Sequence, residues 1–236
     1  MTKSIGENAK DTEAILFLHG YLSSGASFYN QIKYFSKFFS VYAPDLKGFG
    51  QNKGMEKAYT LDDYIDSVEE FKYKHSIKKP HIVAHSFGAR IAIKACALNA
   101  NFCDRLVLTG SAGLKPRLTL KKLVKKTAFK VLSKFVDKSK LSAFYSSDYN
   151  LLEPIMKESF KLIVNEHLDN YLGKIKNQTL IIFGKNDKET PLYMAKRQNL
   201  AIKNSKLEII ANAGHFCFID KPYAFNLKLS EFLLDN

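Results

Sequence analysis

The sequence has few cysteines and no long apolar run. Its three cysteines, Cys96, Cys103 and Cys217, are too few for a disulfide framework and match no zinc-ligand spacing, which fits a reducing compartment. No apolar run approaches the ~20 residues of a membrane span, and residues 1–13 lack the apolar core of a signal peptide. We therefore expect a cytoplasmic protein.

Acidic residues are also scarce, because 23 Asp and Glu stand against 36 Lys and Arg, which gives a formal charge of +13. Such an excess raises the question of nucleic-acid, membrane or acidic-ligand binding. The charge is local: the segment from Lys115 to Lys140 holds ten Lys or Arg and one acid, a net +9. No recognised nucleic-acid-binding motif accompanies it, so we do not expect nucleic acid as a partner.

The rest of the composition is typical of a soluble globular chain, with 236 residues, 46% hydrophobic and 25% charged. Short apolar runs rich in β-branched and aromatic residues predict buried strands at Ala14–Leu18, Phe39–Tyr42, His81–Ala84, Arg105–Thr109, Thr179–Phe183 and Leu207–Ile210. Amphipathic stretches predict helices at Phe28–Phe38, Leu61–His75, Ala89–Ala97, Leu192–Leu200 and Tyr223–Leu234. This alternation predicts an α/β fold with a mostly parallel sheet flanked by helices.

The alternation stops between Leu114 and Ile175, where helical patterns follow one another without a convincing strand. We expect residues 114–175 to form a helical lid inserted into a catalytic core made of residues 1–113 and 176–236. Within the lid, a helix from Thr119 to Val136 carries an apolar stripe on one face and lysines on the other.

A nucleophile-elbow pattern lies around Ser86. The strand ending in His85 is followed at once by Ser86 and then by a helix beginning near Phe87. In such a turn the serine hydroxyl stands above the sheet, and small residues are needed two positions before and after it. Ala84 and Gly88 meet this need, although Ala84 departs from the usual glycine.

A serine hydroxyl needs a base to take its proton, and the base needs a carboxylate to orient it. Asp187 follows the strand Thr179–Phe183, and His215 follows the strand Leu207–Ile210. Because the carboxyl ends of parallel strands share one edge of a sheet, both are expected near Ser86. Glu189 is the nearby alternative to Asp187.

These motifs together resemble the α/β-hydrolase fold family over nearly the whole chain. His19-Gly20-Tyr21 is similar to its H-G-x oxyanion turn, and the segment from Ala43 to Gly50 is similar to its A-P-D-x-x-G-x-G loop. The resemblance implies that Ser86 is the nucleophile, His215 the base and Asp187 the orienting acid. It also implies an oxyanion hole formed by the backbone N–H groups of Tyr21 and Phe87.

Other residues of the same types are expected to be structural. We interpret His85 as a packing residue and His19 as a brace of the oxyanion turn. We interpret Cys217 as a core thiol, because no pattern in the sequence activates it.

The dehalogenases and epoxide hydrolases of the family need aspartate in place of Ser86, so the resemblance implies a serine hydrolase that cleaves acyl esters. It implies no metal and no cofactor. One alternative is a hydrolase of carbon–carbon bonds in meta-cleavage products, for which Arg90 and Arg117 are candidate polar residues. Another is an esterase or thioesterase whose lysine-rich lid meets an acidic carrier protein or an anionic membrane surface. A fourth is a ligand-binding protein with an idle triad.

Overall fold

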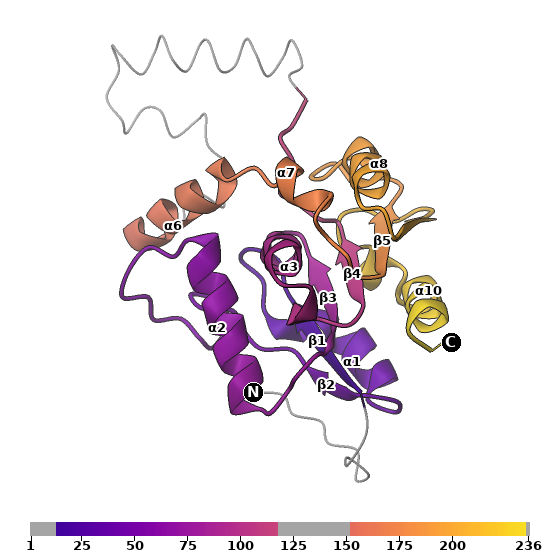
Figure 1. The fold of residues 1–236 in the computed structure, drawn as a ribbon, viewed down its shortest axis with the longest axis horizontal. Helices are drawn as coiled ribbons and strands as arrows, with labels where there is room; N and C mark the ends of the chain where they lie inside the picture. Colours follow the sequence, from indigo (N-terminus) through magenta and orange to yellow (C-terminus); the bar gives the residue numbers. More distant parts are fainter. Residues whose placement is uncertain (1–12, 118–151, 235–236) are drawn as a thin grey trace.

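The computed structural model describes residues 13–117 and 152–234. Its centre is a six-stranded sheet with helices packed around it, as the ribbon in Figure 1 shows. All five strand pairings are parallel, in the order β2-β1-β3-β4-β5-β6. The strands are β1 (Ala14–Leu18), β2 (Ser40–Tyr42), β3 (His81–His85), β4 (Leu106–Thr109), β5 (Thr179–Gly184) and β6 (Ser205–Ile210). The predicted parallel α/β sheet is therefore confirmed.

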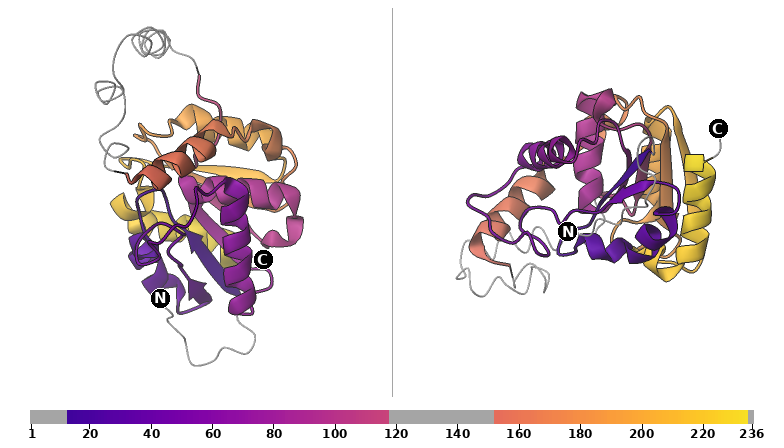
Figure 2. Two further views of the ribbon diagram at one scale, coloured as in Figure 1. Left: turned by 90° about the vertical axis from the view of Figure 1, so that its left-hand side faces the viewer. Right: turned by 90° about the horizontal axis from the view of Figure 1, so that it is seen from below.

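Helices cover both faces of the sheet. One face carries α2 (Leu61–Lys74), α3 (Phe87–Leu98) and α8 (Leu192–Ala201), and the other carries α1 (Tyr29–Phe35), α9 (Cys217–Asp220) and α10 (Pro222–Leu234). Figure 2 shows α10, in yellow, on the opposite side of the sheet from α3. Short 3-10 turns, η1 (Gly25–Phe28) and η2 (Ala100–Phe102), precede α1 and follow α3.

The period of two along β1 explains this layering, because successive strand residues point to opposite faces. Leu16 and Leu18 belong to the core under α3, whereas Ile15 and Phe17 belong to the core under α1 and α10. All four side chains are fully buried. Two apolar cores, one on each face, therefore hold the sheet rigid beneath its loops.

Strand β6 departs from the prediction of a buried strand. It pairs with β5 alone and forms one edge of the sheet, and Ile209 is 44% exposed. An apolar run predicts burial on both faces, but an edge strand with little helix cover keeps one face in water. The run was read correctly as a strand and wrongly as a fully buried one.

The predicted lid is described in part. The helix expected from Thr119 to Val136 and most of the lysine-rich segment fall outside the described residues. The remainder holds α6 (Pro154–Asn165) and α7 (Asp169–Leu172), as the helical pattern predicts. Arg90 on α3 joins α6 to the sheet layer, because its guanidinium donates to the carbonyl oxygens of Ile163 and Glu166. None of the described helices combines the length and hydropathy that crossing a membrane requires.

Candidate active site

Ser86 lies in a strained turn between β3 and α3. Its φ of 50° and ψ of −105° place a non-glycine residue in a sparsely populated backbone region. Two backbone hydrogen bonds hold it there: Ser86 N–H donates to Thr109 O, and Ala112 N–H donates to Ser86 O. Within residues 13–117 and 152–234, the Ser86 hydroxyl makes no hydrogen bond.

Glycine is required where the turn packs against β1. A Cβ added to Gly88 would lie 2.3 Å from the carbonyl oxygen of Leu18, and the Gly88 N–H donates to His19 O. The elbow pattern of small residues around Ser86 therefore has a direct steric cause. This close packing seats the N-terminus of α3 against the segment that follows β1.

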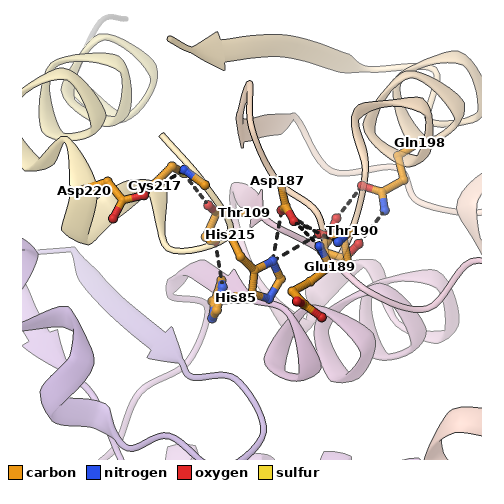
Figure 3. Close-up of polar contacts among 11 residues, drawn as sticks. His85, Thr109, Asp187, Glu189, Thr190, Gln198, His215, Cys217 and Asp220 are labelled. Atoms are coloured by element: carbon orange, nitrogen blue, oxygen red, sulfur yellow. Dashed lines mark hydrogen bonds and ion pairs between the residues drawn. The ribbon is translucent and has the colours of Figure 1, made fainter. Parts of the chain in front are cut away.

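Asp187 and His215 form a hydrogen-bonded pair at the carboxyl ends of β5 and β6 (Figure 3). Nδ1 of His215 lies 2.9 Å from Oδ2 of Asp187, whose side chain is completely buried. A carboxylate at Nδ1 keeps the proton on that nitrogen, which leaves Nε2 as the basic atom. The pair thus has the arrangement of a general base and its orienting acid.

Burial of Asp187 would by itself raise its pKa, but hydrogen bonds reverse the shift. Oδ2 accepts from His215 and from the Thr190 hydroxyl, while Oδ1 accepts from the backbone N–H groups of Glu189 and Thr190. Together these hydrogen bonds hold the pKa of Asp187 below its ordinary value. The carboxylate is therefore charged at neutral pH, next to an imidazole that gains a positive charge when it takes a proton.

His215 also lies beside the segment that holds Ser86. Its ring centroid is 4.6 Å from that of His85, the residue before Ser86. A Cβ on Gly110, which follows Thr109, would lie 3.0 Å from Nδ1 of His215. Three chain segments distant in sequence therefore meet at one edge of the sheet.

The predicted oxyanion turn lies against this site. A Cβ on Gly20 would lie 3.4 Å from Cβ of Ser86, which is ordinary van der Waals contact, so the turn is a direct neighbour of Ser86. His19 braces the turn, because its Nδ1 bonds to Gly20 O and its Nε2 accepts from Leu46 N–H. The N–H of Phe87, the first residue of α3, has no acceptor within the helix and forms part of the positive end of the helix dipole.

A family model described as alpha/beta hydrolase fold matches residues 13–135, which is more than half of the chain. The chain belongs to this family. The match covers β1 to β4, with the oxyanion turn and the Ser86 elbow, whereas Asp187 and His215 lie beyond it.

Relatives of this alpha/beta hydrolase carry different activities in their names. A putative esterase/lipase 2 of Mycoplasma pneumoniae is 28% identical, over 92% of this chain and 88% of its own. A 2-hydroxy-6-oxo-6-(2'-aminophenyl)hexa-2,4-dienoic acid hydrolase of Metapseudomonas resinovorans is 25% identical, over 90% and 81%. The solved meta-cleavage product hydrolase CumD of Pseudomonas fluorescens IP01 superposes with a TM-score of 0.73 at 24% identity, over 98% and 92%.

The other candidates take structural positions in this hydrolase. The backbone N–H of Glu189 donates a hydrogen bond to Asp187, and the carboxylate bonded to His215 is that of Asp187. Cys217 is buried and lies 3.3 Å from the hydroxyl of Thr109, and burial raises the pKa of its thiol to about 12. Arg90 is committed to backbone carbonyls, and Arg117 lies over the ring of Tyr193.

Two contacts of the candidate site were not foreseen from the sequence. Thr190 supplies both a hydroxyl and a backbone N–H to Asp187, and its hydroxyl lies 3.3 Å from Nδ1 of His215. The spacing of Asp and Thr three residues apart is a turn signal that could have indicated it. The second contact, between His85 and the carbonyl of His215, has no sequence signal.

Proposed function

We propose that this alpha/beta hydrolase is a serine hydrolase of carboxylic esters that acts through an acyl-enzyme. The observation that carries the proposal is the Asp187–His215 pair, hydrogen-bonded at 2.9 Å at the sheet edge where Ser86 occupies its strained turn. A nucleophile, a base and an orienting acid converging at one place are the requirements of acyl transfer.

In the first half-reaction, Oγ of Ser86 attacks the ester carbonyl carbon, and Nε2 of His215 takes the hydroxyl proton. The backbone N–H groups of Tyr21 and Phe87 donate to the oxyanion of the tetrahedral intermediate. Collapse of that intermediate breaks the bond to the alcohol oxygen, which receives the proton from His215. Asp187 stabilises the imidazolium while it exists.

In the second half-reaction, water replaces the alcohol. His215 takes a proton from the water as its oxygen attacks the acyl carbon, and the same N–H groups hold the second oxyanion. Breaking the bond to Oγ frees the carboxylic acid and returns the proton to Ser86. Each step uses side chains and main-chain groups of this chain alone.

Replacing Ser86 tests the proposal directly. Ser86→Ala is expected to lower hydrolysis of p-nitrophenyl acetate and butyrate by at least about 1000-fold, because the acyl group loses its acceptor. Circular dichroism and thermal unfolding should match the unmodified protein. Full activity in Ser86→Ala would overturn the assignment.

A matched pair of variants tests the acid. Asp187→Asn is expected to lower kcat by roughly 100-fold or more, because an amide cannot hold His215 in the same tautomer. Glu189→Gln, two residues away, removes a carboxylate that forms no hydrogen bond or ion pair with His215 among the described residues, and should stay within about threefold. The reverse ranking would assign the acid to Glu189.

A carbon–carbon hydrolase is the second candidate, and the 25% identity to a dienoic acid hydrolase favours it. The test is a substrate panel of acyl esters of graded chain length together with one meta-cleavage dienoate. Preference for the dienoate by kcat/KM would select this function, whereas turnover of esters alone would select the first.

The lysine-rich segment, residues 115–140, supports a third proposal: acyl groups reach the site on an acidic carrier protein or at an anionic membrane surface. Neutralising Lys121, Lys122, Lys125 and Lys126 should leave hydrolysis of small neutral esters nearly unchanged and weaken turnover of carrier-bound or membrane-bound substrate. A large loss on small esters would contradict this proposal.

A further inference from the structure

His85 contacts the segment that carries the base. Its Nε2 lies 3.1 Å from the carbonyl oxygen of His215 (Figure 3). The centroid of its ring also lies 4.8 Å from that of Phe216. A carbonyl oxygen can only accept, so Nε2 carries the proton and donates it. This hydrogen bond joins the residue before Ser86 directly to the backbone of His215.

Its surroundings keep His85 neutral. The side chain is fully buried, and burial, together with the neighbouring His215, lowers its pKa to about 3. A neutral ring with its proton on Nε2 leaves Nδ1 as an acceptor, and Nδ1 has no hydrogen-bond partner among the described residues. One N–H, aimed at His215, is the only polar link that this imidazole makes there.

The opposite edge of the ring lies against the oxyanion turn. A Cβ on Gly20 would lie 2.9 Å from Nδ1 of His85, so the turn passes the ring at a distance that leaves no space for a side chain. His85 therefore lies between the base loop and the oxyanion turn and is bonded covalently to Ser86. A shift of this ring would alter its contacts with the base loop and the oxyanion turn and would move the backbone next to Ser86.

We infer that His85 is a positioning residue for catalysis, whose Nε2–H holds the backbone of His215 in register with Ser86 and the oxyanion turn. The inference rests on the proposed function, since it assigns a task only if His215 acts as the base. It goes beyond the packing role expected from the sequence. A purely packing side chain could be replaced by an apolar ring of similar size without loss of reaction rate.

The test measures the rate and the end-point of labelling by a fluorophosphonate. In that reaction Oγ of Ser86 attacks phosphorus, fluoride leaves, and His215 takes the hydroxyl proton. His85→Phe keeps an apolar ring but has no donor, so its labelling rate and kcat should fall roughly 10- to 100-fold. His85→Gln places an amide N–H near the position of Nε2 and should recover most of that loss.

The end-point separates positioning from folding. If His85 positions His215, His85→Phe still labels one serine per chain, but slowly, and KM changes less than about threefold. If His85 only supports the fold, the labelled fraction falls while the folded remainder reacts at the normal rate. That second pattern, or equal rates for the Phe and Gln variants, would overturn the inference.

His81 supplies a matched control at the other end of β3. It is equally buried, and its ring packs against Phe39, away from the site. His81→Phe should label at the unmodified rate even if its thermal stability falls. Absence of labelling in the unmodified protein would refute the proposed function itself. A normal rate in His85→Phe alongside a labelled unmodified protein would refute only the role of His85.

Discussion

At the scale of single residues, the proposed acid, Asp187, is distinguished by the number of its hydrogen-bond donors. Asp187 accepts four hydrogen bonds, and only one of them comes from His215. The other three come from the turn that follows it, so the carboxylate is oriented before any proton moves. Preorganisation of this kind costs no rearrangement in the transition state.

Thr190→Val tests the hydroxyl donor. Valine has nearly the same shape but leaves Oδ2 of Asp187 with His215 as its one side-chain partner, so we expect about a tenfold loss in kcat/KM, equivalent to about 1.4 kcal/mol. Thr190→Ser keeps the hydroxyl and should stay within about threefold. Equal activities in the two variants would show that the hydroxyl is dispensable.

At the scale of elements, helix α3 serves two functions. Its N-terminus places Ser86 and Phe87, and its buried cations anchor α6 farther along. Arg90 donates from one nitrogen to the carbonyls of Ile163 and Glu166, at 2.7 and 3.0 Å. Lys94 pairs with Asp62 and Glu166 one turn later. These contacts tie α2, α3 and α6 into one layer above the sheet.

Arg90→Met is expected to lower the free energy of unfolding by about 2–4 kcal/mol, because two carbonyls at the end of α6 lose a charged donor. Urea denaturation followed by circular dichroism measures the change. Lys74→Met, an exposed lysine at the end of α2, should change stability by less than about 0.5 kcal/mol. A similarly small effect in Arg90→Met would show that α6 is held by its apolar face alone.

The elements themselves were largely predictable, because apolar period and turn residues determine them locally. Six strands and the helices between them match the predicted ranges within a few residues. The bond from His85 to His215 could not be predicted in the same way. It joins residues 130 positions apart, and it depends on how the end of β3 packs against the loop that holds His215 rather than on any local pattern. The order of strands and loops in the sequence indicated that Ser86, Asp187 and His215 lie at one edge of the sheet. Which of their atoms form hydrogen bonds depends on tertiary packing.

At the scale of the whole molecule, two buried histidines make folding sensitive to acid. Burial lowers the pKa of His85 to about 3 and also lowers that of His19, from an ordinary value of 6.5. Between pH 6.5 and the lowered values, the unfolded chain binds more protons than the native one. The stabilisation is therefore complete above pH 6.5 and is lost as the pH falls through this window.

Between pH 7 and pH 5, one such histidine accounts for about 2 kcal/mol of the free energy of unfolding. His85→Gln cannot take up a proton, so its stability should fall less over this range, by about that amount. Chemical denaturation of both proteins at the two pH values measures the difference. Parallel pH dependences would show that His85 does not contribute.

The order of the strands has a kinetic consequence. Ser86 and the oxyanion turn belong to the pairing of β1 with β3, whose contacts lie within the first half of the chain. Asp187 and His215 come into place only when β5 and β6 have joined, and β5 pairs with residues of β4 that are 73 positions away in the sequence. Long-range parallel pairing is slow to form. During refolding, we therefore expect helix formation to be complete before Ser86 becomes reactive. The appearance of a reactive serine would report the pairing of β5 and β6 with the rest of the sheet.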